Sequence, residues 1–288
     1  MNVVLSRSVP RVFIAAGVVL FFSSCQMLWS PNTPKHYVLP RPKKMILDEK
    51  LNEISGLCFV PRENTLLAIA DDKKKIYRLT TDGNATHYFH DDIKTLKDCE
   101  DVVKVDSVVY ALNSNGMITE AAPTDSGVQV QTFSFWSAEK NDFETLYYDA
   151  GSNGLIMLCK SCAEDKGEGQ RTAYRFDLAR KAFDTAPFYT ISTKAVQDKL
   201  KDGKIDFKPS AAAIHPLEKR LYILSSAGNL MVIADLKGSV QEVYRLNPTF
   251  YPQAEGIAFA PNGDLYISNE AKLGKPTLLY IPYKPSGK

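Results

Sequence analysis

The stretch Gln253-Ala254-Glu255-Gly256-Ile257 decides the fold, because variants of it recur along the chain. Each copy places a serine or a glutamate two residues before an apolar residue of a predicted strand. The copies stand about 45 residues apart, with one longer interval, and this is the period of a four-stranded propeller blade. The serines and glutamates of the five copies are Ser55, Glu100, Glu144, Ser210 and Glu255.

Short runs rich in Val, Ile, Leu, Tyr and Phe fill each repeat, and Asp, Asn, Gly and Pro separate them. The separating residues favour tight turns, and this alternation is typical of an all-β sandwich, barrel or propeller. In the first repeat we predict strands near Ile54–Val60, Thr65–Ala70, Lys75–Thr80 and Ala85–His90. Because the repeat period selects the propeller, we expect five four-stranded blades, and six blades remain the alternative.

The third and fifth repeats depart from this plan. The third is longer, and its surplus lies in the charged stretch Ala163–Gln170 and in Thr193–Lys204, which we predict to be a surface helix. The fifth ends one strand short. We predict that the apolar segment His36–Leu39 supplies the missing strand, since closing the ring between the two chain ends removes an exposed sheet edge. The strands predicted in the fifth repeat are near Gly256–Ala260, Asp264–Ser268 and Thr277–Ile281.

The first residues have the pattern of a lipoprotein signal peptide. Arg7 and Arg11 precede or adjoin an apolar run from Val12 to Phe22, and small residues then lead to Cys25. The run is about half of the roughly 20 residues that a transmembrane helix needs. We therefore predict cleavage before Cys25, lipidation of that cysteine, and attachment to a bacterial membrane of the cell envelope. An ordinary secretory signal with an incidental cysteine is the alternative. The predicted parts are a signal peptide (1–24), a lipidated tether (25–34) and a single propeller domain (35–288).

Charge and cysteine content narrow the classes of partner and cofactor. The formal net charge is +2, and removal of the two leader arginines leaves a neutral chain, which argues against nucleic acid as a partner. Cys159 and Cys162 are close enough in sequence to form a local disulfide in an oxidising compartment. Zinc is not expected, because the sequence has no second C-x-x-C pair and no paired histidines.

Propeller geometry gives the repeated serine or glutamate a shared position. If each copy begins an innermost strand, the five side chains surround one mouth of the central channel, and the second strand of each blade returns to that mouth. Glu100, Glu144 and Glu255 would then converge, and close carboxylates repel one another unless protons or a cation neutralise them. Calcium suits such hard oxygen ligands. The other side chains predicted to bind a ligand at this mouth are Ser55, Ser210, Asp71, Asn113, Ser225, Asn269 and Glu270.

A hydrated polar channel, with the glutamates capping strand-end amides, is the structural alternative to a metal site. Ser55 and Ser210 are predicted to be hydrogen-bonding members of the mouth rather than nucleophiles, because neither lies in a G-x-S-x-G motif. His215 precedes a proline at the end of a predicted strand, and we interpret it as a turn residue.

Three motifs are specific enough for comparison with known families: Asn52–Leu57, Pro252–Ala258 and Gly263–Ser268. They resemble the SdiA-regulated family, bacterial envelope proteins with a β-propeller fold. The resemblance covers most of the chain after the signal peptide and implies fold and location rather than mechanism. Ala211, where the family usually has glycine, and the pair of cysteines depart from the family pattern. The chain also looks like a distant relative of calcium-dependent propeller lactonases and esterase-like phytase domains, which is an analogy of fold.

The leading functional hypothesis is a non-catalytic, lipid-anchored module that holds calcium at the mouth and binds an unknown small molecule or envelope protein. The competing hypothesis is a metal-dependent hydrolase of lactonase, esterase or phosphoesterase type, in which the cation polarises a substrate oxygen and a free glutamate acts as base. A third is a structural module whose partner is a protein on the propeller rim. The sequence leaves open whether the protein is an enzyme.

Overall fold

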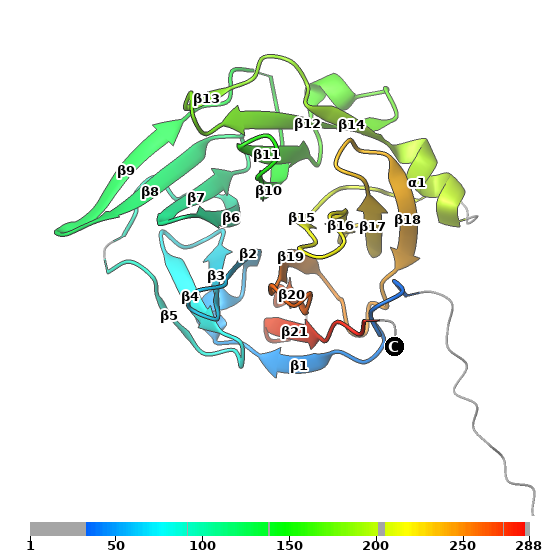
Figure 1. Cartoon of the computed structure of the whole chain (residues 1–288), viewed down its shortest axis with the longest axis horizontal. Helices are drawn as coiled ribbons and strands as arrows, with labels where there is room; N and C mark the ends of the chain where they lie inside the picture. The colour runs from blue at the N-terminus through cyan, green and yellow to red at the C-terminus, as the bar shows by residue number, and fades with distance from the viewer. Residues whose placement is uncertain (1–32, 91, 138, 201–204, 273, 286–288) are drawn as a thin grey trace, which may run out of the picture. The chain divides into compact units, whose positions relative to one another are not determined.

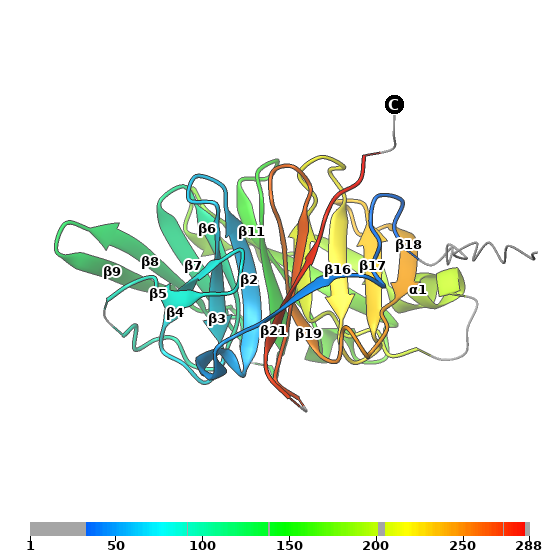
Figure 2. The ribbon, with the colours of Figure 1, turned by 90° about the horizontal axis from the view of Figure 1, so that it is seen from below.

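The repeats fold into the expected ring of blades. The computed structural model describes residues 33–90, 92–137, 139–200, 205–272 and 274–285, and these form five antiparallel sheets around a common axis (Figure 1). The strands run between the two faces of the ring (Figure 2). The chain is therefore a five-bladed β-propeller, as predicted. Cys25 and the predicted signal peptide lie outside these residues, and none of the described helices has the length and hydropathy of a membrane span.

The first two blades follow the four-strand plan, and two strands of the first blade have the predicted bounds. The first blade contains β2 (Ile54–Val60), β3 (Thr65–Ala70), β4 (Ile76–Thr80) and β5 (Ala85–His87), and the 3-10 helix η1 (Glu49–Leu51) precedes it. The second blade contains β6 (Cys99–Val105), β7 (Val108–Asn113), β8 (Ile118–Thr124) and β9 (Gly127–Phe133). The second strands are apolar almost throughout because neighbouring blades cover both of their faces.

The third blade explains the long interval between Glu144 and Ser210. Its outermost strand is split into two pieces, which pair with opposite ends of the same neighbour, and a helix follows in the predicted segment. The third blade contains β10 (Phe143–Asp149), β11 (Gly154–Cys159), η2 (Ala163–Asp165), β12 (Gln170–Asp177), β13 (Ala182–Phe183) and β14 (Tyr189–Ser192), and helix α1 (Thr193–Leu200) comes next. The fourth blade contains β15 (Ala211–Ile214), β16 (Leu221–Ser225), β17 (Leu230–Ala234) and β18 (Val240–Arg245).

The fifth blade is completed by an N-terminal strand, but the predicted segment was wrong. The strand is β1 (Lys43–Ile46), which pairs antiparallel with β21, and not His36–Leu39. Tyr37 and Leu39 are 1% and 3% exposed and pack in the core between the fourth and fifth blades. Their apolar character therefore reflects burial, whereas the outermost strand needs only its backbone and leaves Ile46 63% exposed. The other strands of this blade are β19 (Ala254–Phe259), β20 (Leu265–Asn269) and β21 (Thr277–Ile281).

Hydrophobic clusters between adjacent blades hold the ring together, and the innermost strands contact one another in sequence around the axis. Gly256 shows how tight this contact is. A Cβ atom at Gly256 would lie 2.3 Å from Ser268 Oγ and 2.9 Å from Leu57 Cγ, the latter on the next blade. The glycine that follows Glu255 in the repeat therefore permits β19 and β2 to approach closely.

Candidate functional site

The repeated serine or glutamate is an extra residue in its strand. The ladder between the first and second strands shifts register at Ser55, Glu100, Glu144 and Glu255, so each of these residues forms a β-bulge. A bulge redirects a side chain from the regular pleat. In the fourth blade, Ser210 directly precedes β15, and its N–H group donates to the carbonyl of Leu224 (2.9 Å). The repeat therefore places one polar side chain at the start of every innermost strand.

A second set of residues follows the second strands and closes each blade at the same end. In four blades the N–H group of this residue donates to the carbonyl of the residue two positions before the bulge, as in Asp71 to Glu53 (3.1 Å) and Lys160 to Asp142 (2.9 Å). In the fourth blade the N–H group of Ser226 donates to Ser210 Oγ instead (3.2 Å). We call this end of the propeller axis the mouth. Its residues are Glu53, Ser55, Asp71, Asp98, Glu100, Ser114, Asp142, Glu144, Lys160, Lys208, Ser210, Ser226, Gln253, Glu255 and Glu270.

Negative charge dominates the mouth. Among the mouth residues the acids come from four blades, and the basic side chains are Lys208, which takes the equivalent position in the fourth blade, and Lys160. Its ammonium group forms an ion pair with Glu144 Oε1, and its charge also acts on Glu100 and Glu255. Lys208 stands two residues before Ser210, but its ammonium group pairs with Asp206 (3.0 Å) outside this set. The carboxylates therefore outnumber the positive charges that face them.

Burial and mutual repulsion raise the pKa values of these acids. Burial, followed by the charge of Asp98, raises the pKa of Glu100 to about 8, although Lys160 opposes the rise. Burial and the charge of Glu255 raise the pKa of Glu270 to about 8. Both groups are therefore mostly protonated at neutral pH, and a bound cation would favour their ionised forms.

One carboxylate oxygen in the mouth lacks any hydrogen-bond partner. Glu144 is 9% exposed, and its Oε1 atom pairs with Lys160 while Oε2 is buried without a partner. Leaving a buried charged oxygen unpaired is costly, roughly 1–3 kcal/mol or more. Such an atom is a candidate ligand for a cation.

The mouth has the right donor chemistry for calcium, but its side chains are not arranged as a finished cage. Carboxylate and carbonyl oxygens are the ligands that calcium prefers. However, no group of three His, Cys, Asp or Glu side chains within the described part of the chain lies in position to hold a metal ion. Glu100, Glu144 and Glu255 come from three blades, so calcium would require their carboxylates to come together around one ion.

The predicted residues Asn113, Ser225 and Asn269 bind the loops that lead into the innermost strands. Asn113 Nδ2 donates to the carbonyl of Lys97, and Ser225 Oγ accepts from the N–H group of Lys208 (2.9 Å). Asn269 Nδ2 donates to the carbonyl of Phe250 (3.3 Å), and its Oδ1 atom has no partner. All three are buried. They therefore lie behind the mouth rather than with its carboxylates.

The two serines predicted at the repeated motif position, Ser55 and Ser210, also bind backbone atoms. Ser55 Oγ donates to the carbonyl of Glu53 (3.1 Å). Ser210 Oγ donates to the carbonyl of Ala254 in the fifth blade (2.8 Å) and accepts from the N–H group of Ser226 (3.2 Å). The side chains of Ser210 and Ser226 also hydrogen-bond the Glu255 carboxylate, which opposes the rise in its pKa caused by burial.

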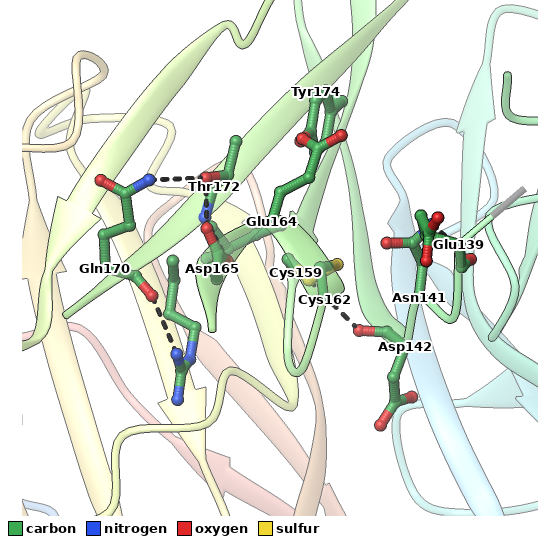
Figure 3. The surroundings of a disulfide bond; sticks show 12 residues. Glu139, Asn141, Asp142, Cys159, Cys162, Glu164, Asp165, Gln170, Thr172 and Tyr174 are labelled. Atoms are coloured by element: carbon green, nitrogen blue, oxygen red, sulfur yellow. Dashed lines mark hydrogen bonds between the residues drawn. A yellow bond between two sulfur atoms is a disulfide. The ribbon is translucent and has the colours of Figure 1, made fainter. Parts of the chain in front are cut away.

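The mouth residues predicted from the sequence did not include Lys160 or the acids Glu53, Asp98 and Asp142. The acids had a detectable signal, because each stands two residues before the repeated serine or glutamate. Lys160 follows the second strand of its blade, as Asp71 and Glu270 do in theirs. The predicted disulfide, Cys159–Cys162, is present with Cα atoms 6.0 Å apart (Figure 3), and Lys160 lies in the loop that it closes.

The opposite end of the axis has a different character. A cavity of about 170 Å³ is lined there by mostly apolar side chains from all five innermost strands, including Phe59, Tyr148 and Phe259. Beside it, His215 Nδ1 accepts from two backbone N–H groups (3.1 and 3.0 Å), so Nε2 carries the proton and donates to Tyr37 Oη (2.7 Å). Tyr37 donates in turn to the carbonyl of Gly263 (2.5 Å). His215 thus has a structural role in fastening the N-terminal segment.

Several solved structures share the fold at low sequence identity. They include a gluconolactonase from Xanthomonas campestris (12% identity, TM-score 0.56, covering 88% of this chain and 99% of that chain) and a glutaminyl cyclase from Myxococcus xanthus (12%, 0.57, 88% and 97%). A soluble aldose sugar dehydrogenase from Escherichia coli is a third (11%, 0.53, 85% and 100%). At such identities the likeness shows the fold alone.

Sequence comparison gives the more specific result. No curated protein matches the chain. The profile of the SdiA-regulated family matches residues 33–161 and 174–280. These ranges contain all five copies of the repeated motif and most of the propeller. The chain therefore belongs to the SdiA-regulated family.

Proposed function

We propose that this protein is a lipid-anchored binding module of the cell envelope that holds a divalent cation, calcium, at the mouth of its propeller. Glu100, Glu144 and Glu255 would be the ligands, and Cys25 would carry the lipid. The observation that carries the proposal is the unpaired, buried Oε2 atom of Glu144 in a mouth crowded with carboxylates. An unknown small molecule or envelope protein would bind on the same face.

The electrostatics of the mouth support a cation rather than an anion as its first ligand. A divalent ion would offset the repulsion that raises the pKa values of Glu100 and Glu270. Its binding would release protons from these groups near neutral pH. A hydrolytic function is not proposed, because the enzymes with this fold are only 11–12% identical to the chain, and at such identities the likeness shows the fold alone.

The test is calorimetric titration of the full chain with calcium chloride. We expect binding by the wild type, with an enthalpy that depends on the ionisation enthalpy of the buffer because protons are released. The variant Glu100→Gln/Glu144→Gln/Glu255→Gln should lose the binding. The matched control removes three exposed carboxylates, Glu49→Gln/Glu139→Gln/Glu168→Gln, and should bind calcium as the wild type does. A folded wild type without calcium binding would overturn the proposal.

A further inference from the structure

The outermost strand of the second blade has an open edge. Strand β9 pairs with β8 over its whole length and with no other strand of the described chain. Strand β7 pairs with β8 only as far as Ala121, so the end of the β8–β9 hairpin extends beyond the rest of its sheet. Figures 1 and 2 show this hairpin at the periphery of the ring, with β9 on the outside. The outer edge of β9 therefore presents backbone N–H and carbonyl groups to a partner strand.

The outermost strands of the other four blades are protected. Strand β5 has three residues, β13 and β14 are two short pieces, helix α1 contacts β18, and β1 begins with two lysines. Shortness, cover and charge are the features by which natural sheets avoid pairing with other chains. In contrast, β9 has seven residues, and no charged residue occurs between Asp125 and Glu139. Val130, in the middle of the strand, is 38% exposed. Among the described blades, the second is therefore the one with a long, uncharged outer edge.

We infer that β9 is a self-association surface, through which two copies of this chain pair antiparallel about a two-fold axis at Val130. The inference does not depend on the proposed cation site. In this register Gln129 of one copy lies opposite Gln131 of the other, and their side-chain amides can hydrogen-bond. The next pair outward is Val128 opposite Thr132, so β-branched residues face one another, as they do at the axis.

The sequence of β9 favours a second copy of the chain as the occupant of this edge. Reversing the strand about Val130 matches each residue from Val128 to Thr132 with one of its own kind, and the absence of charge removes like-charge repulsion between identical strands. The contact would join the two second blades into one continuous sheet. Because a two-fold contact uses the open edge of both copies, association stops at the dimer.

The test measures self-association of the full chain by sedimentation equilibrium. We expect a wild-type dimer with a dissociation constant on the order of 10 µM, since one pair of strands buries less than a standard interface of roughly 1,200–2,000 Å². Val130→Lys and Val130→Glu each place like charges opposite one another and should weaken the dimer about tenfold or more. A mixture of these two variants should restore association, because opposite charges then face each other. The matched control is Leu217→Lys, which changes another exposed apolar residue and should have little effect.

Cysteine cross-linking tests the register. Residues directly opposite in an antiparallel pair have Cα atoms roughly 4.5–5.5 Å apart, a separation that a disulfide can span. Val130→Cys should therefore form a disulfide-linked dimer under mild oxidation. Thr132→Cys should cross-link poorly with itself but well when mixed with Val128→Cys. The wild type, treated in the same way, controls for the cysteines that the chain already has.

Several outcomes would overturn the inference. A folded wild type that remains monomeric at roughly 100 µM would do so, as would a dimer that Val130→Lys leaves intact. An equal loss in Leu217→Lys would place the contact elsewhere or make it non-specific. If mixing Val130→Lys with Val130→Glu restores nothing, or if Thr132→Cys alone cross-links better than Val130→Cys, the two-fold pairing at Val130 is wrong. Calcium titrations decide the proposed function separately, because β9 contributes no residue to the mouth.

Discussion

Buried ionisable groups have opposite environments at the two ends of the propeller axis. At the mouth, Glu144 keeps an oxygen without a partner, and crowding raises the pKa of Glu100 to about 8. At the other end, both ring nitrogens of His215 are hydrogen-bonded, and burial lowers its pKa to about 4, which keeps the ring neutral. At the His215 end, other groups of the protein supply hydrogen-bond partners for both ring nitrogens. At the mouth, an imbalance of charge remains that a bound cation would remove.

This contrast predicts opposite pH dependences for the two ends. The pKa of His215 is lower in the folded chain than the ordinary value of 6.5, so its contribution to stability is complete above pH 6.5 and is lost as the pH falls toward 4. The pKa of Glu100 is higher in the folded chain than the ordinary value of 4.5. Its contribution is complete below pH 4.5 and is lost as the pH rises through 8.

The largest effect should come from removing the aromatic ring at the His215 end. Tyr37 is 1% exposed and packs between the fourth and fifth blades. We expect Tyr37→Ala to lower the free energy of unfolding by about 3–5 kcal/mol, as for other buried aromatic truncations, and urea denaturation measures it. Calcium affinity should not change, because Tyr37 is at the end opposite the mouth.

Tyr37→Phe separates packing from hydrogen bonding at this position. The ring remains, but His215 Nε2 and the carbonyl of Gly263 lose their partner, so we expect a smaller loss of about 1–2 kcal/mol. A Tyr37 variant that folds and yet loses calcium binding would show that the two ends are coupled, and the comparison between them would no longer hold.

The fold was predictable because every blade contains a copy of the same motif, so the period of the propeller can be read from the sequence. The five copies of the motif and the alternating turns predicted the blades, and the additional residues of the third repeat predicted helix α1. The strand that closes the ring was predicted too early in the sequence. The apolar residues Tyr37 and Leu39 are buried in the core without forming a strand, whereas Lys43–Ile46 forms the strand that pairs with β21. An outermost strand bonds through its backbone, so its side chains carry little signal of pairing.

The site was only partly predictable. The repeat identified Glu100, Glu144 and Glu255 as equivalent positions, because the bulge recurs with the motif. The sequence could not show that Asn113 binds a loop carbonyl or that Lys160 faces Glu144. Both facts depend on the direction of a side chain at a strand end, and periodicity describes faces of a strand rather than its ends.

The second largest effect should be the loss of stability at acidic pH. Protonation of His215 would break its bonds to the N–H groups of Leu217 and Glu218, and the pKa difference corresponds to roughly 3 kcal/mol between pH 6.5 and 4. We expect His215→Gln to be less stable than the wild type at pH 7 and to lose less of its remaining stability on acidification. Urea titrations at pH 7 and pH 4.5 measure the difference. Parallel losses in the two proteins would show that other groups set the acid limb.

At the mouth we expect a gain of stability, similar in size to the loss in Tyr37→Phe. Glu100→Gln removes a group that ionises at high pH next to other carboxylates. At pH 8.5 we therefore expect the free energy of unfolding of the variant to be about 1–2 kcal/mol higher than that of the wild type. The figure is below the full pKa difference because solvent screens a partly exposed group. At pH 4.5, where the wild-type carboxyl is also neutral, the two proteins should agree closely.

Equal stabilities at pH 8.5 in calcium-free buffer would mean that the mouth carries no net repulsion, and its contrast with the His215 end would disappear. Saturating calcium should reverse the order of the two proteins, since only the wild type keeps the full set of ligands and ligand binding stabilises the folded state.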